Sequence, residues 1–370
     1  MATLADAGLT FTTLAHPAPA SAETRAAVLA NPGFGTNFTD HMVTIEWTEG
    51  QDGVGRWHDA VIGPRQPIPL DPAAAVLHYA QEIFEGLKAY KQADGAIALF
   101  RPEANAARFN QSAERLAMPA LPESVFVEAI EKLVQIDRAW IPEGEGASLY
   151  LRPFMIATEA FLGVRPAKQY KFIVIASPAG NYFKSGAPAV SIWVSDYTRA
   201  APGGTGAAKC GGNYAASLVP QAEAIARGHD QVVFLDAAEH KWIEELGGMN
   251  LYFAFDDGTL LTPELTGTIL PGITRDSLLQ LAREEGLTVT EGRYSLDQWR
   301  ADAASGKLIE TFACGTAAVV TSVGKVSGRD GDFTIGTGGP GQLTGKLKNR
   351  LVSIQRGEAP DTHGWIRKIG

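Results

Sequence analysis

The amino-acid sequence predicts a two-domain protein of the α+β or α/β class. The chain has 370 residues, which is enough for two domains with separate cores. Strand-like and helix-like segments alternate along it, as they do in proteins of this class. Residues 178–188 concentrate Gly, Pro, Ser and Asn between two strand-like runs, which is typical of a linker. We therefore expect an N-terminal domain at 1–180, a linker at 181–188 and a C-terminal domain at 189–370.

The first half is expected to fold as strands and helices after a loosely held arm at residues 1–30, which are rich in Ala, Thr and Pro. The run 76–90 leads to Asp94-Gly95, a hairpin-type turn. Apolar residues at helical spacing within 123–139 are Val125, Ala129, Leu133 and Ile136. The expected strands are 43–47, 97–100, 149–158 and 170–177, and the expected helices are 104–118 and 123–139.

The second half alternates in the same way. Pro271-Gly272 precedes a helix that starts near Thr274. Unpaired N–H groups and the positive end of the helix dipole make such a start suitable for an anion, although most helix starts are ordinary capped ends. The expected strands are 190–194, 231–235, 249–255 and 308–312, and the expected helices are 214–227, 274–285 and 342–354.

Composition excludes several classes of function. The net charge is −9 and there is no long basic block, which argues against nucleic acid or an anionic membrane as the main partner. The two cysteines, Cys210 and Cys314, are far apart in the sequence, so we do not expect a disulfide framework. We expect the protein to be located in a reducing compartment. The histidines lack metal-ligand spacing, and neither a signal peptide nor a membrane-spanning run is recognised. We expect a cytoplasmic protein without a metal site.

One lysine, Lys209, lies among small residues in the stretch 203–218, GGTGAAKCGGNYAASL. Glycines let the backbone approach a bound group, and partial desolvation frees a lysine amine to act as a nucleophile. A surface loop with its lysine in water is the alternative. A nucleotide-phosphate loop is disfavoured, because Ala208 precedes the lysine and Cys210 replaces the Ser or Thr that holds magnesium. The G-x-G-x-x-G match at 336–341 lacks a following βαβ unit and is dismissed.

Further residues suited to one cofactor are spread along the chain. Pyridoxal phosphate needs an amine for its aldehyde, an acid that keeps its ring nitrogen protonated, and donors for its phosphate. No other common cofactor asks for all three together. The candidates are Lys209, Tyr214, the acid pair Glu244-Glu245, Arg108, the helix start at Thr274 and the Gly-Thr turn at Thr316.

Eight short stretches, which together span nearly the whole chain, give a more specific signal. They are FGTNFTDHM (34–42), IFEGLKAY (83–90), ANAARF (104–109), SLYLRP (148–153), GGTGAAKCGGNYAASL (203–218), EELGGMN (244–250), LPGITRDSLL (270–279) and FACGTAAV (312–319). In this order they resemble the branched-chain amino acid aminotransferases of fold-type IV. The resemblance implies a smaller N-terminal α+β domain, a larger C-terminal domain with a mixed sheet or pseudo-barrel, and a homodimer with its active site near the subunit interface.

The resemblance implies a cofactor role for several residues. Lys209 would hold pyridoxal 5′-phosphate as an aldimine and later move the proton between the substrate α-carbon and the cofactor. Glu245, rather than Glu244, would pair with the pyridine nitrogen, and Tyr214 would bond the phenolic oxygen. The implied phosphate ligands are Arg108, Thr316 and the backbone amides of Ile273 and Thr274.

The resemblance also implies how substrates bind. Arg152 would recognise the distal carboxylate of glutamate, and Ala317 and Gly248 would lie near the α-carboxylate. Some relatives have threonine at position 248, so a hydroxyl contact is missing here. Vertebrate members carry a C-x-x-C pair where this chain has 317–320, AAVV, so a thiol switch is not expected there. The residues implied to line the apolar side-chain pocket are Phe38, Tyr79, Phe84 and Tyr150.

The predicted activity is reversible transamination between Leu, Ile or Val and 2-oxoglutarate by a ping-pong mechanism. One apolar pocket accepts all three amino acids, because each methylene changes binding by only about 1–3 kcal/mol. A fold-type IV relative, such as a D-amino acid aminotransferase or an aminodeoxychorismate lyase, is the near alternative. A non-catalytic protein that binds a small anion is the distant one.

Overall fold

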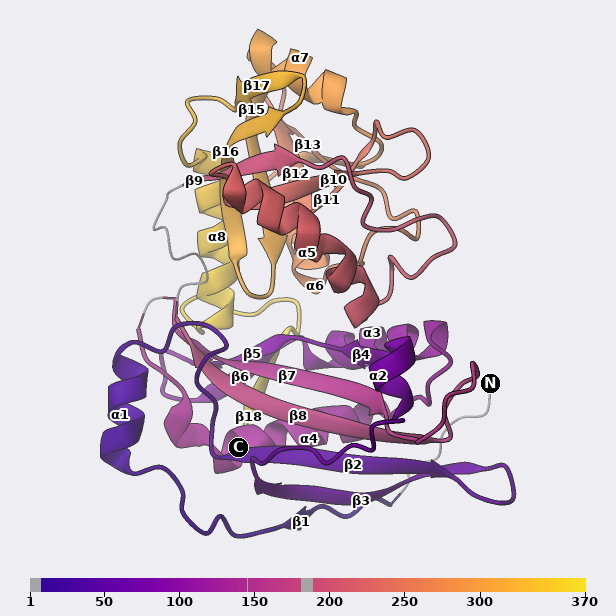
Figure 1. The fold of residues 1–370 in the computed structure, drawn as a ribbon. Coiled ribbons are helices and arrows are strands. Elements are labelled where there is room, and N and C mark those ends of the chain that lie inside the picture. The colour runs from indigo at the N-terminus through magenta and orange to yellow at the C-terminus, as the bar shows by residue number, and fades with distance from the viewer. Residues whose placement is uncertain (1–7, 145, 181–188) are drawn as a thin grey trace. The chain divides into compact units, whose positions relative to one another are not determined.

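The computed structural model describes residues 8–144, 146–180 and 189–370 (Figure 1). The expected linker at 181–188 lies outside the described residues. The chain forms two compact units. Unit 1 comprises Met1–Tyr182, Ala208–Gly211 and Ile354–Gly370, and unit 2 comprises Phe183–Ala207 and Gly212–Ser353. Two segments distant in sequence, 208–211 and 354–370, therefore belong with the N-terminal part, while the division at 181–188 stays a prediction.

Unit 1 is built on a sheet of nine strands among the described residues, in the order β1-β3-β2-β8-β7-β5-β6-β18, with β4 paired to β7. All pairs are antiparallel except β1 with β3. The C-terminal strand β18 pairs with β6, which fastens the end of the chain to this sheet. The strands are β1 (Thr12–Thr13), β2 (His41–Glu49), β3 (Gly55–Pro64), β4 (Glu82–Phe84), β5 (Leu87–Lys91), β6 (Ile97–Phe100), β7 (Ser148–Ala157), β8 (Gln169–Ala179) and β18 (Ile366–Ile369).

Helices α3 and α4 pack on the sheet of unit 1 through aromatic side chains. The Phe109 and Phe126 rings lie 5.3 Å apart, and both contact Phe172 of β8. The helical spacing expected in α4 is confirmed for its buried residues, but Ile136 is 37% exposed at the helix end. The helices are α1 (Ala22–Ala30), α2 (Ala75–Tyr79), α3 (Pro102–Arg115), α4 (Glu123–Ile136) and the 3-10 helix η1 (Arg138–Trp140).

Two segments of the first half contain elements that the sequence did not predict. The arm at 1–30 contains helix α1, whose first turn is capped by the Ser21 side chain accepting from the Thr24 N–H at 3.1 Å. The run 76–90 is not one element but α2, β4 and β5 in succession. The chain is not in a strand at Glu85-Gly86, between β4 and β5, and the Glu85 side chain is buried there.

Unit 2 contains a mixed sheet that closes on itself. Its order among the described residues is β11-β10-β9-β16-β15-β12-β13-β14, with β17 paired to β16, and β11 also pairs with β12. Strands β11, β10, β9, β16, β15 and β12 therefore form a ring, as the predicted pseudo-barrel requires. The strands are β9 (Ala189–Val194), β10 (Gln231–Leu235), β11 (Ile243–Leu246), β12 (Met249–Phe255), β13 (Thr259–Thr262), β14 (Thr288–Glu291), β15 (Leu308–Gly315), β16 (Val319–Gly328) and β17 (Gly331–Thr334).

The helices of unit 2 agree with the sequence pattern except for one that was not expected. Helix α7 begins with a capping box, in which Ser295 accepts from the Gln298 N–H and the Gln298 side chain accepts from the Ser295 N–H. Gly306 ends it in the left-handed conformation. The helices are α5 (Gly211–Ala226), α6 (Ile273–Glu284), α7 (Leu296–Ser305) and α8 (Gln342–Gln355).

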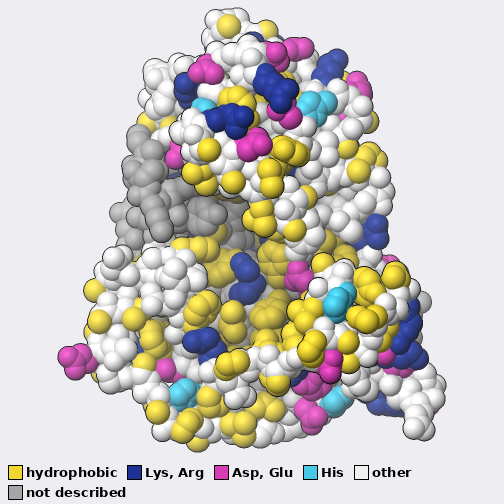
Figure 2. All heavy atoms as spheres, viewed as in Figure 1, with side chains coloured by type: hydrophobic (Ala, Val, Ile, Leu, Met, Phe, Trp, Pro, Cys, Tyr) yellow, Lys and Arg dark blue, Asp and Glu magenta, His cyan; other side chains and the backbone are white. Residues whose placement is uncertain are grey.

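The surface carries both basic and acidic side chains, as the composition of the sequence predicts. On the face in Figure 2, lysine and arginine side chains are interspersed with acidic and apolar ones. Within residues 8–144, 146–180 and 189–370, every helix is too short or too polar to span a lipid bilayer.

Candidate active site

Lys209 lies in the short segment Ala208–Gly211, which packs into unit 1. Its backbone N–H donates to the hydroxyl of Ser112 on α3 at 2.9 Å, and its carbonyl accepts from the Phe84 N–H at 2.9 Å. Ala208 and Cys210 on either side are buried in the core of this unit. The lysine itself is half-buried, with its ammonium nitrogen 4.7 Å from the centre of the Phe84 ring. This environment differs from a surface loop with its lysine in water.

The acid next to Phe84 holds the arginine predicted to bind phosphate. Glu85 is fully buried, and its carboxylate accepts from Arg108 Nε at 2.7 Å and Nη2 at 2.8 Å. Asn105 Nδ2 donates to the same carboxylate at 2.7 Å, and the Gly86 N–H donates at 3.1 Å. Burial raises the pKa of Glu85, but the Arg108 charge and these donors outweigh it and leave the pKa below its ordinary value. Glu85 is therefore a buried anion that fixes the guanidinium of Arg108.

Three residues of the predicted substrate site come together in unit 1. Arg152 Nη2 donates to the Tyr150 hydroxyl at 3.0 Å, and the Arg152 guanidinium lies 4.8 Å from the centre of the Phe84 ring. Gly86 makes this packing possible, because a Cβ there would lie 2.2 Å from the Tyr150 hydroxyl oxygen. Tyr150 also packs edge-on against Phe34 at 5.0 Å. The result is an arginine with aromatic faces around it.

The other two predicted pocket residues of unit 1 have different neighbours. Phe38 is half-buried, with the Arg65 guanidinium 5.0 Å from its ring centre. Tyr79 is 38% exposed at the end of α2, and its hydroxyl donates to the carbonyl of Leu162. Their assignment to the side-chain pocket stays a prediction.

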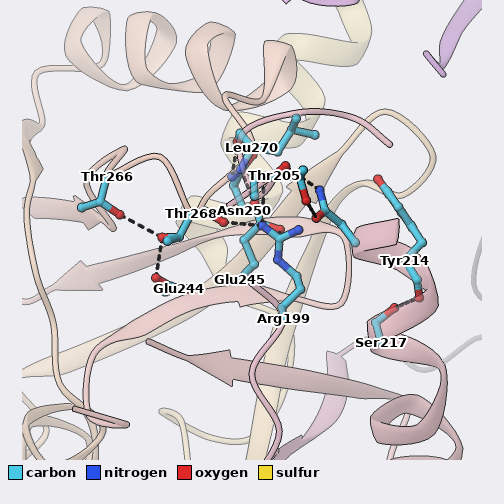
Figure 3. Close-up of polar contacts among 12 residues, drawn as sticks. Arg199, Thr205, Tyr214, Ser217, Glu244, Glu245, Asn250, Thr266, Thr268 and Leu270 are labelled. Carbon is cyan, nitrogen blue, oxygen red and sulfur yellow. Dashed lines mark hydrogen bonds and ion pairs between the residues drawn. The ribbon is translucent and has the colours of Figure 1, made fainter. Parts of the chain in front are cut away.

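In unit 2, strand β11 presents two adjacent glutamates to opposite faces (Figure 3). Glu245 is 2% exposed, and its Oε1 accepts from the Leu270 N–H at 2.6 Å. Its Oε2 lies 3.1 Å from Nε of Arg199. Arg199 is also buried, and its Nη2 donates to the carbonyl oxygens of Thr268 at 2.5 Å and Gly206 at 3.3 Å. Glu245 therefore has the surroundings of a carboxylate ion.

Glu244 has different surroundings although it is the next residue. It is buried, and one carboxyl oxygen accepts from the Thr268 hydroxyl at 2.5 Å. The Thr266 and Thr268 hydroxyls are in turn 2.9 Å apart. Burial raises the pKa of Glu244, and the Thr268 hydrogen bond and the Arg199 charge offset this only in part. Of the two acids, Glu245 alone is in direct ion-pair contact with the arginine, among the residues that the structure describes.

The segment around Lys209 is tied at both ends by two side chains that sequence reasoning did not single out. The Thr205 hydroxyl donates to Asn213 Oδ1 at 2.8 Å, and Asn213 Nδ2 donates to the Thr205 carbonyl at 2.8 Å. Asn213 is buried, so this pair fixes the start of α5. A hydroxyl and an amide eight residues apart are a weak sequence signal, because only the folded loop brings them together.

Tyr214, in the first turn of α5, lies against Gly248. A Cβ at position 248 would be 3.3 Å from Cε1 and 3.6 Å from the hydroxyl oxygen of Tyr214. A larger residue there would press on the tyrosine ring. The glycine that sequence reasoning treated as a missing hydroxyl contact therefore also leaves space for Tyr214.

The remaining candidates in unit 2 lie at a helix start and in a turn. Helix α6 begins at Ile273 after Gly272, which supplies no side-chain cap. Thr274 is buried in its first turn. Thr316 and Ala317 follow β15 in the turn to β16, and both are half-buried. This turn ends at Val319, whose φ of 61° is a strained conformation for a β-branched residue and is typical of functional segments.

Comparison with known proteins gives consistent similarities. Residues 82–326 match the family model for amino-transferase class IV. The chain is 56% identical to the branched-chain-amino-acid aminotransferase of Mycolicibacterium smegmatis, over 98% of each chain. It is 59% identical to a probable branched-chain-amino-acid aminotransferase of Streptomyces coelicolor, over 95% of this chain and 96% of the relative.

Solved structures of similar fold point the same way. The branched-chain amino acid aminotransferase of Escherichia coli is 28% identical with a TM-score of 0.73, covering 88% of this chain and 99% of that one. The T.th. enzyme of the same name, complexed with N-(5′-phosphopyridoxyl)-L-glutamate, is 30% identical with a TM-score of 0.70. The match covers 88% of this chain and 98% of that one.

Proposed function

The chain belongs to the class IV aminotransferases, among the branched-chain-amino-acid aminotransferases, and from this premise we propose the chemistry of its site. It transfers an amino group reversibly between leucine, isoleucine or valine and 2-oxoglutarate, with pyridoxal 5′-phosphate as cofactor. Relatives of the same name over nearly the full length support the reaction. The T.th. enzyme has been solved with pyridoxamine 5′-phosphate, which supports the cofactor.

The donor set of this chain fits that cofactor. The half-buried amine of Lys209 carries the proposal, because a primary amine whose backbone is fixed between buried neighbours is a group that can react with an aldehyde. Glu245 is a buried anion suited to a protonated ring nitrogen. The start of α6 follows Gly272, which supplies no side-chain cap, and a helix start is suited to an anion. When bound, the cofactor supplies the aldehyde that takes up the amino group and the ring that accepts electrons.

Each residue has a defined task. Lys209 holds the cofactor and moves a proton at its Nζ atom. Glu245 holds its charge toward the ring nitrogen, and Tyr214 donates toward the phenolic oxygen. The phosphate is assigned to Arg108, Thr316 and the backbone amides of Ile273 and Thr274.

Substrate recognition is assigned to Arg152 and to the residues predicted to contact the side chain and the α-carboxylate. Arg152, oriented by Tyr150, supplies the cation for the second carboxylate of glutamate. Its contact with aromatic faces lets the same place accept an apolar side chain when that carboxylate is absent. The apolar side chain is assigned to Phe38, Tyr79, Phe84 and Tyr150, and the α-carboxylate to the neighbourhood of Gly248 and Ala317.

Assembly and location complete the proposal. We infer a cytoplasmic homodimer with domains at 1–180 and 189–370, because the resemblance to the family implies the dimer and the cysteine content fits a reducing compartment. Cys210 and Cys314 are both buried and free, and burial raises the pKa of the Cys314 thiol well above its ordinary value.

A visible absorption spectrum of the purified protein with pyridoxal 5′-phosphate tests the function. An absorption band of the lysine-bound cofactor that bleaches with leucine and returns with 2-oxoglutarate supports both half-reactions. A band that ignores leucine but responds to D-alanine shifts the assignment to the D-amino acid relatives. A protein that takes up no pyridoxal phosphate overturns the proposal.

A further inference from the structure

We propose that Arg199 is a positioning residue for Glu245, which it holds ionised and in one orientation, so that a proton shared with a bound ring nitrogen stays on the ring. This inference rests on the proposed function. Arg199 was not among the residues that the sequence singled out, and it is not assigned to the cofactor or the substrate. It acts through Glu245.

Both oxygens of the Glu245 carboxylate have a fixed neighbour. Oε2 lies 3.1 Å from Arg199 Nε, and Oε1 accepts from the Leu270 N–H at 2.6 Å (Figure 3). The side chains of Arg199 and Glu245 are 5% and 3% exposed. Oε1 is fixed by a hydrogen bond and Oε2 lies at ion-pair distance from the Arg199 charge, so the orientation of this buried carboxylate is restricted.

Arg199 is itself held by backbone atoms. Its Nη2 donates to the carbonyl oxygens of Thr268 and Gly206. Gly206 approaches Thr268 so closely that a Cβ on it would lie 2.4 Å from the Thr268 carbonyl oxygen. The planar guanidinium is therefore fixed by main-chain positions, as a rigid fork of donors allows.

The charge of Arg199 decides where a shared proton resides. When a carboxylate and a ring nitrogen share one proton, a cation 3.1 Å from the carboxylate stabilises its negative form more strongly than it repels the more distant ring charge. Glu244 shows the contrasting case in the same strand, because burial without a direct arginine contact raises its pKa. Two charged groups act on the neighbouring Glu244: Arg199 lowers its pKa and Asp236 raises it.

The test is a double-mutant cycle on the full chain without cofactor, using Arg199→Met, Glu245→Gln and the double variant. Arg199→Met leaves a buried carboxylate without its cation, so the folded state favours its protonated form. That penalty is present at high pH and is relieved as pH falls through the raised pKa. We expect Arg199→Met to lower the melting temperature more at about pH 8 than at about pH 5.5, and to lower it less in the Glu245→Gln background.

Two further variants separate charge from packing. Arg199→Lys keeps the charge, so it should remove most of the pH-dependent loss of melting temperature that Arg199→Met introduces. Arg275→Met is the matched control: Arg275 is 4% exposed, lies in the same unit and pairs with Glu291 at 2.7 Å. It should lose stability by the same amount in the wild-type and Glu245→Gln backgrounds. If Arg199→Met behaves in the same way, with equal losses at both pH values and in both backgrounds, the inference is overturned.

The loaded enzyme gives a second readout. In Arg199→Met, kcat should fall about tenfold while KM changes little, because the interaction supports the reacting state and not substrate binding. The absorption spectrum should become pH-dependent where that of the wild type is not, and Arg199→Lys should reverse this. If the wild type takes up no cofactor, the proposed function fails, yet the stability cycle still reports on the pair. If the wild type turns over and the cycle shows no coupling, the inference alone fails.

Discussion

Two buried glutamates, one in each unit, contact an arginine in opposite ways. Glu85 accepts from two nitrogens of Arg108, from Asn105 and from a backbone N–H. Glu245 Oε2 lies 3.1 Å from Arg199 Nε, while Arg199 also donates to two backbone carbonyls. In unit 1 the acid fixes the arginine, and the arginine is the proposed ligand for phosphate. In unit 2 the arginine fixes the acid, and the acid is the proposed ligand for the ring.

The largest effect should come from the amine beside the first pair. We expect Lys209→Ala to lower turnover of leucine with 2-oxoglutarate by at least about 10³-fold, because alanine lacks the amine that the proposed reaction requires at this position. Steady-state assays of cofactor-saturated protein measure this, with Lys307→Ala as control because the Lys307 side chain is 57% exposed. Near-normal rates for the Lys209 variant would remove it from the mechanism.

The comparison predicts unequal costs for breaking the two pairs. Glu85→Gln leaves Arg108 buried without its carboxylate and should lower the free energy of unfolding by about 3–5 kcal/mol. Glu245→Gln should lower the free energy of unfolding by less, about 1–3 kcal/mol. In this variant Arg199 still donates hydrogen bonds to the carbonyl oxygens of Thr268 and Gly206. Urea unfolding of both variants measures the difference. Equal losses of unfolding free energy in the two variants would mean that the hydrogen bonds to the two carbonyls do not offset the loss of the Glu245 charge beside Arg199.

A smaller effect should distinguish Gly206, whose carbonyl accepts from Arg199, from Gly212 in α5. Gly206→Ala places a Cβ against the Thr268 backbone at 2.4 Å and should cost about 1–3 kcal/mol, because the main chain must shift. Gly212→Ala, in α5, meets no atom within 4 Å and should be neutral or stabilising. Thermal unfolding of the two variants compares them. An unchanged melting temperature for Gly206→Ala would show that the backbone that accepts from Arg199 can shift easily.

The smallest effect concerns Glu244, the neighbour without a direct arginine contact. Burial raises its folded-state pKa above the ordinary value of 4.5, so its charged form destabilises the fold as pH rises through that pKa. Relative to the wild type, Glu244→Gln should therefore gain stability with rising pH, by no more than about 1 kcal/mol. Melting temperatures measured from about pH 5 to about pH 8 follow this gain. A gain that instead grows towards low pH would mean that the folded-state pKa is lowered.

Sequence patterns predicted the elements that carry a strong local signal. Helix α4 was found because its apolar residues recur at helical spacing, and β12 because it is apolar throughout most of its length. Helix α7 was not expected, since its polar sequence shows little periodicity, although the Ser295–Gln298 capping box was visible. Helix α1 was also not expected, although Ser21, which caps its N-terminus, was visible in the sequence. Caps are a better guide than periodicity when a helix has no wide buried face.

The site was predicted unevenly for a similar reason. Lys209, Tyr214 and the acid pair Glu244-Glu245 were singled out from the residues themselves, whereas Arg152 and the choice of Glu245 came from the resemblance to the family. Arg199 and Glu85 were not singled out, since an arginine or glutamate is ordinary until its burial and partner are known. Their partners lie far away in sequence, so spacing carries no information about the contact.

The sequence by itself identified the chain as a class IV aminotransferase, because its motifs occur in a fixed order along the chain. It also predicted a lysine, Lys209, as the reacting group. Tertiary structure alone decided which glutamate contacts an arginine. It also decided that β11 pairs with both β10 and β12 to close the barrel, and that residues 208–211 join the N-terminal unit. The physical reason is that burial and ion pairing depend on which surfaces meet, and no local property of adjacent residues such as Glu244 and Glu245 distinguishes them.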